Sequence, residues 1–266
     1  MLYVVATPIG NLADMSHRAI EVLKNCEYIL CEDTRTSLVL LKHYNIEKKL
    51  VSYHKFNEAS KCDSIAKDIS EGKDVALISD AGMPGISDPG AVIIRYLKQK
   101  GLPYTVVPGA SALINAFVLS GYDAPFTFVG FLPEKNKAKK DLLSSLASSQ
   151  YPSIYYVSPH SITEFFDDVI TAFGDREVCV VRELTKKFEE VTFTTLQDGY
   201  NGTVKGEFVI VVKGCNVEVA DNITDERLIE EMQALIDSGK SKKDASKLIA
   251  EKYNLKKNYV YNLSIK

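Results

Sequence analysis

The first 130 residues alternate short runs of β-branched and apolar residues with longer stretches of helical periodicity. The candidate strands lie at residues 3–6, 28–31, 50–53, 75–79, 104–107 and 126–131. Between them, apolar residues recur along one helical stripe, as at Ala19, Ile20 and Leu23. This alternation predicts an α/β fold with a mainly parallel sheet that helices cover on both faces.

Changes of pattern along the chain predict three units. Residues 1–131 form an N-terminal α/β domain, and residues 132–218 form a second α/β domain with more antiparallel character. Residues 219–266 form a small helical module, in which Thr224 caps a helix over 225–238 and two short helices follow, broken near Asn254. The polar stretch 134–140, EKNKAKK, indicates an exposed connection or the start of a helix.

The C-terminal module is strongly basic. Residues 240–266 hold eight lysines against Asp244 and Glu251, which is a net charge of +6. Because the whole chain has a net charge of −3, residues 1–239 have a net charge of −9. Two short helices around a tight turn are similar to a helix-turn-helix module, and the lysines favour a polyanionic partner. A solvated helical cap is the alternative that this pattern leaves open.

Composition excludes several classes of protein. The chain is 45% hydrophobic and 25% charged, which is ordinary for a folded domain, and no apolar run reaches the roughly 18 residues of a membrane span. The N-terminus is expected to be a strand and not a signal peptide. Five scattered cysteines without paired spacing predict a reduced, cytoplasmic setting. No metal is expected, because the four histidines lie far apart in the sequence.

Loops rich in glycine and proline follow three of the predicted strands. They lie at residues 7–12, 79–90 and 108–112. Because ligands bind outside the carboxyl ends of parallel strands, these loops are expected to form a nucleoside-sized cradle at one edge. Asp80 and Asp88 can accept hydrogen bonds from ribose or amino groups there. The dinucleotide and P-loop fingerprints do not occur after any predicted strand, which disfavours dehydrogenases and P-loop NTPases.

Eight motifs in order resemble one known family. They are YVVATPIGNL, EDTR, SYHKFNE, ALISDAGMPGISDPG, VPGASALINA, VGFLP, YYVSPH and RELTKKFEEV. Together they are similar to the RsmI family of small-subunit ribosomal RNA 2′-O-methyltransferases, of the tetrapyrrole-methylase superfamily. The resemblance runs from Met1 to about Gly214 and extends into the lysine-rich tail.

The resemblance implies two α/β domains of the tetrapyrrole-methylase type with S-adenosylmethionine in the cleft between them. It implies methylation of a cytidine ribose in the decoding region by a cytoplasmic homodimer whose partner is small-subunit ribosomal RNA or the ribosomal subunit. The cofactor-binding residues that it implies are Pro8, Ile9, Asp80, Gly82, Met83, Ser111, Ala112, Tyr156, Val157, Leu184 and Phe208. The family usually has threonine where Met83 stands and proline where Ala110 stands.

Polar residues after the second and third strands are the candidates for proton transfer and phosphate binding. They are Glu32, Asp33, Arg35, His54, Asn57 and Glu58. We rank Glu32 first as the acceptor of the 2′-hydroxyl proton, then Glu58 and His54, with Asp33 orienting Arg35 toward a phosphate. Alternatively, these residues only position RNA and water takes the proton. The competing functions are a small-molecule, tetrapyrrole-type methylase and a non-catalytic nucleotide- or RNA-binding module.

Overall fold

The computed structural model describes residues 1–215, 224–253, 255 and 257–263. The chain divides into two compact units, Met1–Lys213 and Gly214–Lys266. The first unit contains two five-stranded sheets, and the described residues of the second form three helices. The boundary expected at residues 218–219, the break at Asn254, and Lys256 and Lys266 lie outside the described residues.

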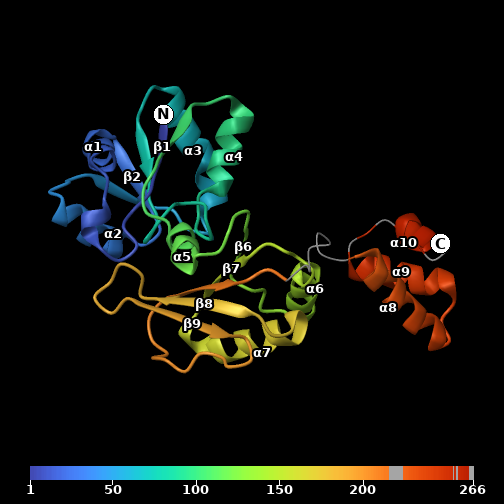
Figure 1. Cartoon of the computed structure of the whole chain (residues 1–266). Coiled ribbons are helices and arrows are strands. Elements are labelled where there is room, and N and C mark those ends of the chain that lie inside the picture. Colours follow the sequence, from blue (N-terminus) through green and yellow to red (C-terminus); the bar gives the residue numbers. More distant parts are fainter. Residues whose placement is uncertain (216–223, 254, 256, 264–266) are drawn as a thin grey trace. The chain divides into compact units, whose positions relative to one another are not determined.

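The first sheet, which contains the strands labelled β1 and β2 in Figure 1, is wholly parallel, in the order β3-β2-β4-β1-β5. Its strands are β1 (Leu2–Val5), β2 (Tyr28–Cys31), β3 (Lys49–Ser52), β4 (Val75–Leu77) and β5 (Tyr104–Val107). They alternate with α1 (His17–Asn25), α2 (Thr34–His43), α3 (Glu58–Ser70) and α4 (Ala91–Lys100), and a short 3-10 helix follows β1 at Leu12–Asp14. Parallel neighbours need such crossovers, so the predicted parallel sheet is confirmed.

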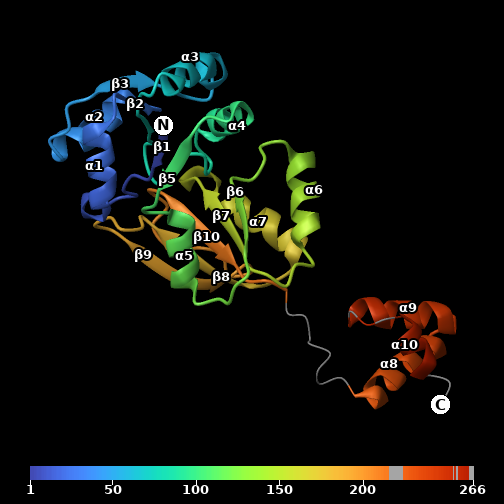
Figure 2. The same ribbon diagram turned by 90° about the horizontal axis from the view of Figure 1, so that it is seen from above.

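Helices cover both faces of this sheet, as predicted (Figure 2). Leu23 of α1 and Leu41 of α2 pack on one face, while α3 and α4 pack on the other. Successive strand residues point to opposite faces, so Val4 joins one core and Val5 joins the other. The four carboxyl ends of β1, β2, β4 and β5 therefore meet at one edge, where the predicted loops lie.

The second sheet is mixed, in the order β6-β7-β10-β8-β9. Its elements are β6 (Thr127–Gly130), β7 (Ser153–Val157), β8 (Glu177–Arg182), β9 (Glu190–Thr195) and β10 (Phe208–Val212). Only β6 and β7 pair in parallel, which agrees with the predicted antiparallel character. One expectation was wrong: the strand predicted at 126–131 pairs with β7, so it belongs to the second sheet and not to the first.

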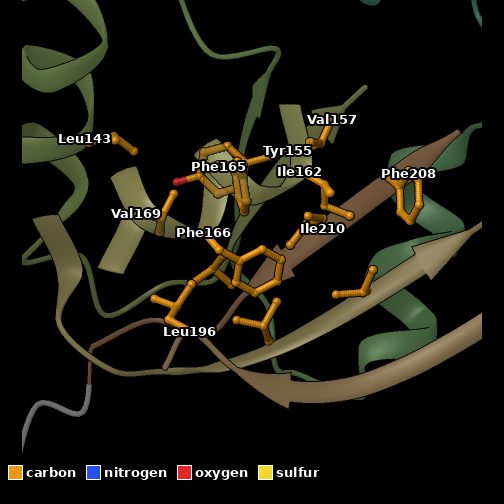
Figure 3. Packing of buried hydrophobic residues seen from close by; sticks show 13 residues of the cluster. Leu143, Tyr155, Val157, Ile162, Phe165, Phe166, Val169, Leu196, Phe208 and Ile210 are labelled. Atoms are coloured by element: carbon orange, nitrogen blue, oxygen red, sulfur yellow. The ribbon is translucent and has the colours of Figure 1, made fainter. Parts of the chain in front are cut away.

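Helices from both halves of the chain cover the second sheet. Helices α6 (Asn136–Leu146) and α7 (Ile162–Phe173) follow β6 and β7, the latter after a 3-10 turn at Pro159–Ser161. Phe165, Phe166 and Val169 of α7 fill the core on one face with Tyr155 and Ile210 (Figure 3). On the other face lies α5 (Ala112–Ser120), the helix that follows β5, and its packing joins the two sheets.

The lysine-rich stretch 134–140 is only partly an exposed connection. Lys139 of α6 is buried, and its ammonium lies 2.6 Å from Glu164 and 2.5 Å from Asp168 of α7. A buried cation with two carboxylate partners holds two helices together and cannot reach a phosphate. The stretch therefore begins helix α6, which was the second of the two expectations for it, and Lys139 is not exposed.

The C-terminal unit is a three-helix module with its own core. It contains α8 (Asp225–Asp237), α9 (Lys242–Lys252) and α10 (Lys257–Leu263). Leu228 and Met232 of α8 pack against Ile249 of α9 and Val260 of α10. The Thr224 hydroxyl accepts from the Arg227 amide, so the predicted N-cap is confirmed.

Candidate active site

A cavity of about 470 Å³ opens where the strand-end loops of the first sheet face the second sheet. We call it the inner cavity. Its lining residues are Ile9, Glu32, Asp80, Ala81, Gly82, Met83, Ile86, Ser87, Asp88, Ser111, Ala112, Phe131, Tyr156, Val157, Ser158, Pro159, Leu184, Gly206, Glu207, Phe208 and Val209. Apolar walls with a few convergent polar groups are typical of a small-molecule site of this size.

Backbone hydrogen bonds hold the loops after β1 and β4 together. Thr7 and Gly82 exchange both amide hydrogen bonds, at 2.8 and 3.1 Å. The hydroxyl groups of Thr7 and Ser79 reinforce this bridge by donating to loop carbonyls. Gly82 has a φ of 81°, and an added β-carbon would stand 3.3 Å from Ile9, so glycine suits both its conformation and its space.

The loop after β5 presents the start of α5 to the cavity. Ser111 stands at the N-cap position, and its hydroxyl makes no capping hydrogen bond. The first amides of a helix lack intrahelical partners, so this end offers hydrogen-bond donors to a bound ligand. Gly109 lies against Ala6, where an added β-carbon would come within 2.8 Å, and this close approach sets where α5 begins.

The second sheet supplies the opposite wall through two strained residues. Glu183 and Thr185, just after β8, have φ values of 51° and 65°, in the left-handed region. They flank Leu184, which lines the cavity. Lys186 bridges Glu183 and Glu207 at 2.8 and 2.9 Å, which ties this loop to the start of β10. Left-handed backbone of this kind clusters at ligand sites.

Four carboxyl groups line the inner cavity, and for three of them, Glu32, Asp80 and Asp88, the pKa is raised. Burial, followed by the charges of Glu32 and Asp80, raises the pKa of Asp88 to about 6. The pKa of Glu32 is also raised, first by burial and then by Asp80. Burial raises the pKa of Asp80, although its carboxylate accepts a hydrogen bond from the Asp33 amide. A bound cation would relieve this mutual repulsion.

The substitution Asp88→Asn should raise the melting temperature at pH 8, and the gain should shrink as the pH falls from about 6 toward 4. The native carboxyl keeps its proton to a higher pH than the unfolded one, so the wild-type chain loses stability as the pH rises across this interval. After allowance for solvent screening, we expect the substitution to raise the free energy of unfolding at pH 8 by about 1 kcal/mol, which raises the melting temperature by about 2 °C. Thermal unfolding at pH 4.5 and 8 measures it, with the exposed Asp141→Asn as control. An equal gain at both pH values would contradict the assignment.

An open groove of about 540 Å³ adjoins the inner cavity, and we call it the outer groove. It is lined by Glu32, Asp33, Thr34, Arg35, Ser52, His54, Lys55, Phe56 and Asp80. Glu32 and Asp80 line both spaces, so these two carboxyl groups stand at the junction. A group bound in the groove can therefore meet a group bound in the cavity at Glu32 and Asp80.

The orientation of His54 is set by Asn57. The side-chain oxygen Oδ1 of Asn57 accepts a hydrogen bond from the His54 backbone amide at 2.9 Å. This bond fixes the orientation of the Asn57 side chain, and its Nδ2 then lies 3.1 Å from Nε2 of the His54 imidazole. Nε2 of the neutral ring is then an acceptor, and we assign the proton to Nδ1. Nδ1 is buried with no hydrogen-bond partner in the described part of the chain. The Nδ1 donor is therefore not accessible in the outer groove, and acting as a base through Nε2 would cost the Asn57 hydrogen bond.

The remaining proton-transfer candidates differ in position. Asp33 binds the Arg35 guanidinium at 2.6 Å and caps α2, as expected for an orienting residue, and this contact lowers the pKa of Asp33 to about 2. Glu58 opens α3 and lines neither the cavity nor the groove.

In the portion that the structure describes, no group of histidine, cysteine and acidic residues is arranged to hold a metal ion. No described helix is long and apolar enough to cross a membrane.

The structure brings together ten of the eleven residues proposed for cofactor binding; Pro8 is the one that does not line the cavity. Met83 lines the cavity and also packs against the core of the first sheet. Sequence reasoning did not assign Phe131, Ser158, Gly206 and Glu207 to the site. Their contact with the cavity depends on how the second sheet packs against the first, and the motifs give no information on this packing.

Comparisons with known proteins place the chain in a family. Residues 1–199 match the model of the tetrapyrrole (corrin/porphyrin) methylases. The ribosomal RNA small subunit methyltransferase I of Mycoplasmopsis pulmonis is 48% identical over 79% of this chain and 96% of its own length. Proteins of the same name from Halalkalibacterium halodurans and Bacillus subtilis are 38% and 41% identical over 98% of this chain and 93% of their own lengths. The chain belongs to the ribosomal RNA small subunit methyltransferase I family.

Solved structures confirm the fold of this family member. The methyltransferase CobJ aligns with a TM-score of 0.61 at 15% identity, covering 80% of this chain and 94% of that one. The cobalt precorrin-4 methyltransferase CbiF aligns with a TM-score of 0.59 at 20% identity over the same shares. The predicted α/β architecture of the tetrapyrrole-methylase type is thus confirmed. Identities this low establish the fold alone.

Proposed function

We propose that the chain is an S-adenosylmethionine-dependent methyltransferase that modifies small-subunit ribosomal RNA. The methyl acceptor proposed is the ribose 2′-hydroxyl of a cytidine in the decoding region. The observation that carries this function is the junction at Glu32 and Asp80, where a deeper cavity and a more open groove share two carboxyl groups. Such an arrangement suits a small donor held inside and a large acceptor approaching from outside.

The residues of the inner cavity fit S-adenosylmethionine. Glu32, Asp80 and Asp88 provide negative charge for a cationic ligand, and burial together with neighbouring carboxylates raises the pKa values of all three. The free amides at Ser111 and Ala112 offer donors for a carboxylate or an adenine edge. When bound, S-adenosylmethionine supplies a methyl group that is already activated on a sulfonium.

The protein's own contribution is to orient the acceptor and to take its proton. Orientation of two reactants can supply several kcal/mol of the barrier, about 7 to 11 in favourable cases. Glu32 stands at the junction, and its raised pKa brings it closer to neutral pH, where a general base works best. Arg35 keeps guanidinium donors beyond the Nε and Nη2 groups that Asp33 engages, and these can bind a backbone phosphate.

One assay tests the function. Radiolabelled methyl transfer is measured to small ribosomal subunits, to naked small-subunit RNA and to a porphyrinogen, followed by nuclease digestion to locate the label. We expect ribose-labelled RNA. Label in the porphyrinogen alone would indicate the tetrapyrrole methylase, and no transfer would indicate a binding module. Comparison of subunits with naked RNA identifies the physiological form of the substrate.

The C-terminal unit is proposed to hold RNA through exposed lysines. Lys240 and Lys243 are exposed, and Lys252 is paired with Glu231 at 2.8 Å. A chain ending at Lys213 should bind S-adenosylmethionine like the full chain and hold RNA more weakly. Each phosphate that the shortened chain no longer binds should reduce the salt slope by about 0.7 to 0.9. Filter binding across salt concentrations measures this; an unchanged slope would mean that the module is a structural cap.

We also propose a cytoplasmic homodimer. The edge strand β5 and helix α5 expose apolar side chains, including Tyr104, Val106, Ile114 and Val118. An exposed apolar edge strand is a template for pairing with a second copy. The buried free thiols of Cys26, Cys31, Cys62 and Cys179 suit a reducing compartment.

A further inference from the structure

Phe56 is the most exposed large hydrophobic residue in the described part of the chain. Its side chain is 94% exposed, and it lies on the wall of the outer groove. The only ring contact described for it is with His54, edge to face, at 6.1 Å between centroids. A single exposed apolar residue is common on protein surfaces. Its position beside the proposed reaction site, and the way in which the chain holds it there, call for an explanation.

A tight turn fixes the backbone that carries Phe56. The amides of Asn57 and Glu58 both donate to the His54 carbonyl at 2.9 Å, which closes the turn between β3 and α3. The Asn57 side chain bonds both the His54 amide and the Ser52 carbonyl. Lys61 also donates to the Ser52 carbonyl, at 2.5 Å. The turn is therefore anchored on each side of Phe56 while the phenyl ring points away from the core, as a preorganised contact surface would.

The charges around the ring distinguish the kind of partner. Lys55 and Arg35 are exposed along the same groove, and Glu32 and Asp80 lie at its inner end. The cations suit phosphate groups, and the carboxyl groups suit hydroxyl donors such as those of a ribose. The exposed aromatic ring suits the face of a base. The groove therefore offers one kind of contact for each of the three parts of an unstacked nucleotide.

We propose that Phe56 is a stacking platform for the base of the nucleotide to be methylated. This inference rests on the proposed function, because it assigns the outer groove to the RNA substrate. The base leaves its stack and lies on the phenyl ring, its phosphate meets Lys55 and Arg35, and its ribose faces Glu32. Sequence-specific recognition of RNA commonly uses single-stranded bases stacked on aromatic side chains in this way.

The first test compares Phe56→Ala with the control Phe193→Ala, an exposed phenylalanine of β9 in the second sheet. Loss of one base–aromatic stack should weaken RNA binding and raise KM about 5- to 150-fold. Phe56→Tyr should restore most of the loss, because it keeps the ring. Affinity for S-adenosylmethionine, measured by calorimetry, should stay at the wild-type value in all variants and verifies that each is folded.

The second test uses fluorescence, because the chain contains no tryptophan. Phe56→Trp introduces a single indole whose emission a stacked base should quench on titration with a single-stranded RNA oligonucleotide, whereas Phe193→Trp should remain bright. Unchanged emission at saturating RNA, or wild-type RNA affinity in Phe56→Ala, would overturn the proposal. If Phe56→Ala bound assembled subunits more weakly but bound naked RNA like the wild-type chain, the proposal would also be overturned. Phe56 would then contact a ribosomal protein. If the wild-type chain did not methylate RNA, the proposed function would be refuted. Quenching of the emission of Phe56→Trp would still show that a base stacks on the ring at position 56.

Discussion

Ser111→Tyr should abolish measurable binding of S-adenosylmethionine while the fold remains intact. Ser111 lines the inner cavity at the start of α5, with φ of −149°, an extended conformation that tyrosine adopts without strain. Its hydroxyl makes no capping hydrogen bond, so the native helix loses none. A phenol ring at this position would occupy space in a cavity of about 470 Å³ and cover the free amides of α5. We expect affinity to fall by more than about 100-fold, or about 2.7 kcal/mol.

Isothermal calorimetry measures this loss, and circular dichroism with thermal unfolding verifies the fold. Ser144→Tyr, on the exposed side of α6, is the matched control and should bind like the wild-type chain. Ser111→Ala should retain most of the affinity, since it keeps the backbone donors and the space. A folded Ser111→Tyr protein with wild-type affinity would move the cofactor out of the inner cavity. Gly82→Val is a poorer test, because its φ of 81° strains any β-branched residue whether or not a ligand binds.

The sequence predicts the positions of the strands well. Of the six strands predicted up to residue 131, β2 and β5 begin and end at the predicted residues, and the others deviate by small shifts at their ends. Buried strands leave clear apolar runs, and turn residues bound them. The sequence does not show which sheet β6 joins, because a strand after a crossover helix can extend the old sheet or begin a new one. The structure decides this through α5, which packs on the second sheet.

Lys139 shows a different limit. A lysine in the run EKNKAKK is expected to be solvated, yet it shares the buried face of α6 with Leu143, four residues later. Its partners Glu164 and Asp168 are likewise four residues apart on α7. The helical spacing on both sides was present in the sequence, but the pairing of the two helices was not. The motif resemblance named ten residues that the structure brings to the inner cavity, because it carries such long-range information as residue identities.

Glu32→Gln should reduce the single-turnover rate of RNA methylation by about 100- to 10,000-fold, the usual contribution of a general base. The amide keeps the size of the side chain and cannot accept the proton from the 2′-hydroxyl. Glu32 must be ionised to act, and burial together with Asp80 raises its pKa. The wild-type rate should therefore rise with pH on the acidic side, and in Glu32→Gln this rise should flatten. Affinities for RNA and S-adenosylmethionine should change far less than the rate.

The comparison variants separate this role from positioning. Glu58→Gln, outside both the cavity and the groove, should react at close to the wild-type rate, and His54→Ala should lose less than Glu32→Gln because its Nε2 is already engaged by Asn57. If Asp88→Asn reduced the single-turnover rate more than Glu32→Gln does, the proton acceptor would be Asp88, whose pKa of about 6 also suits a general base. A loss below about tenfold in Glu32→Gln, at saturating RNA and cofactor, would mean that water takes the proton and that the junction carboxyl groups only position the ribose.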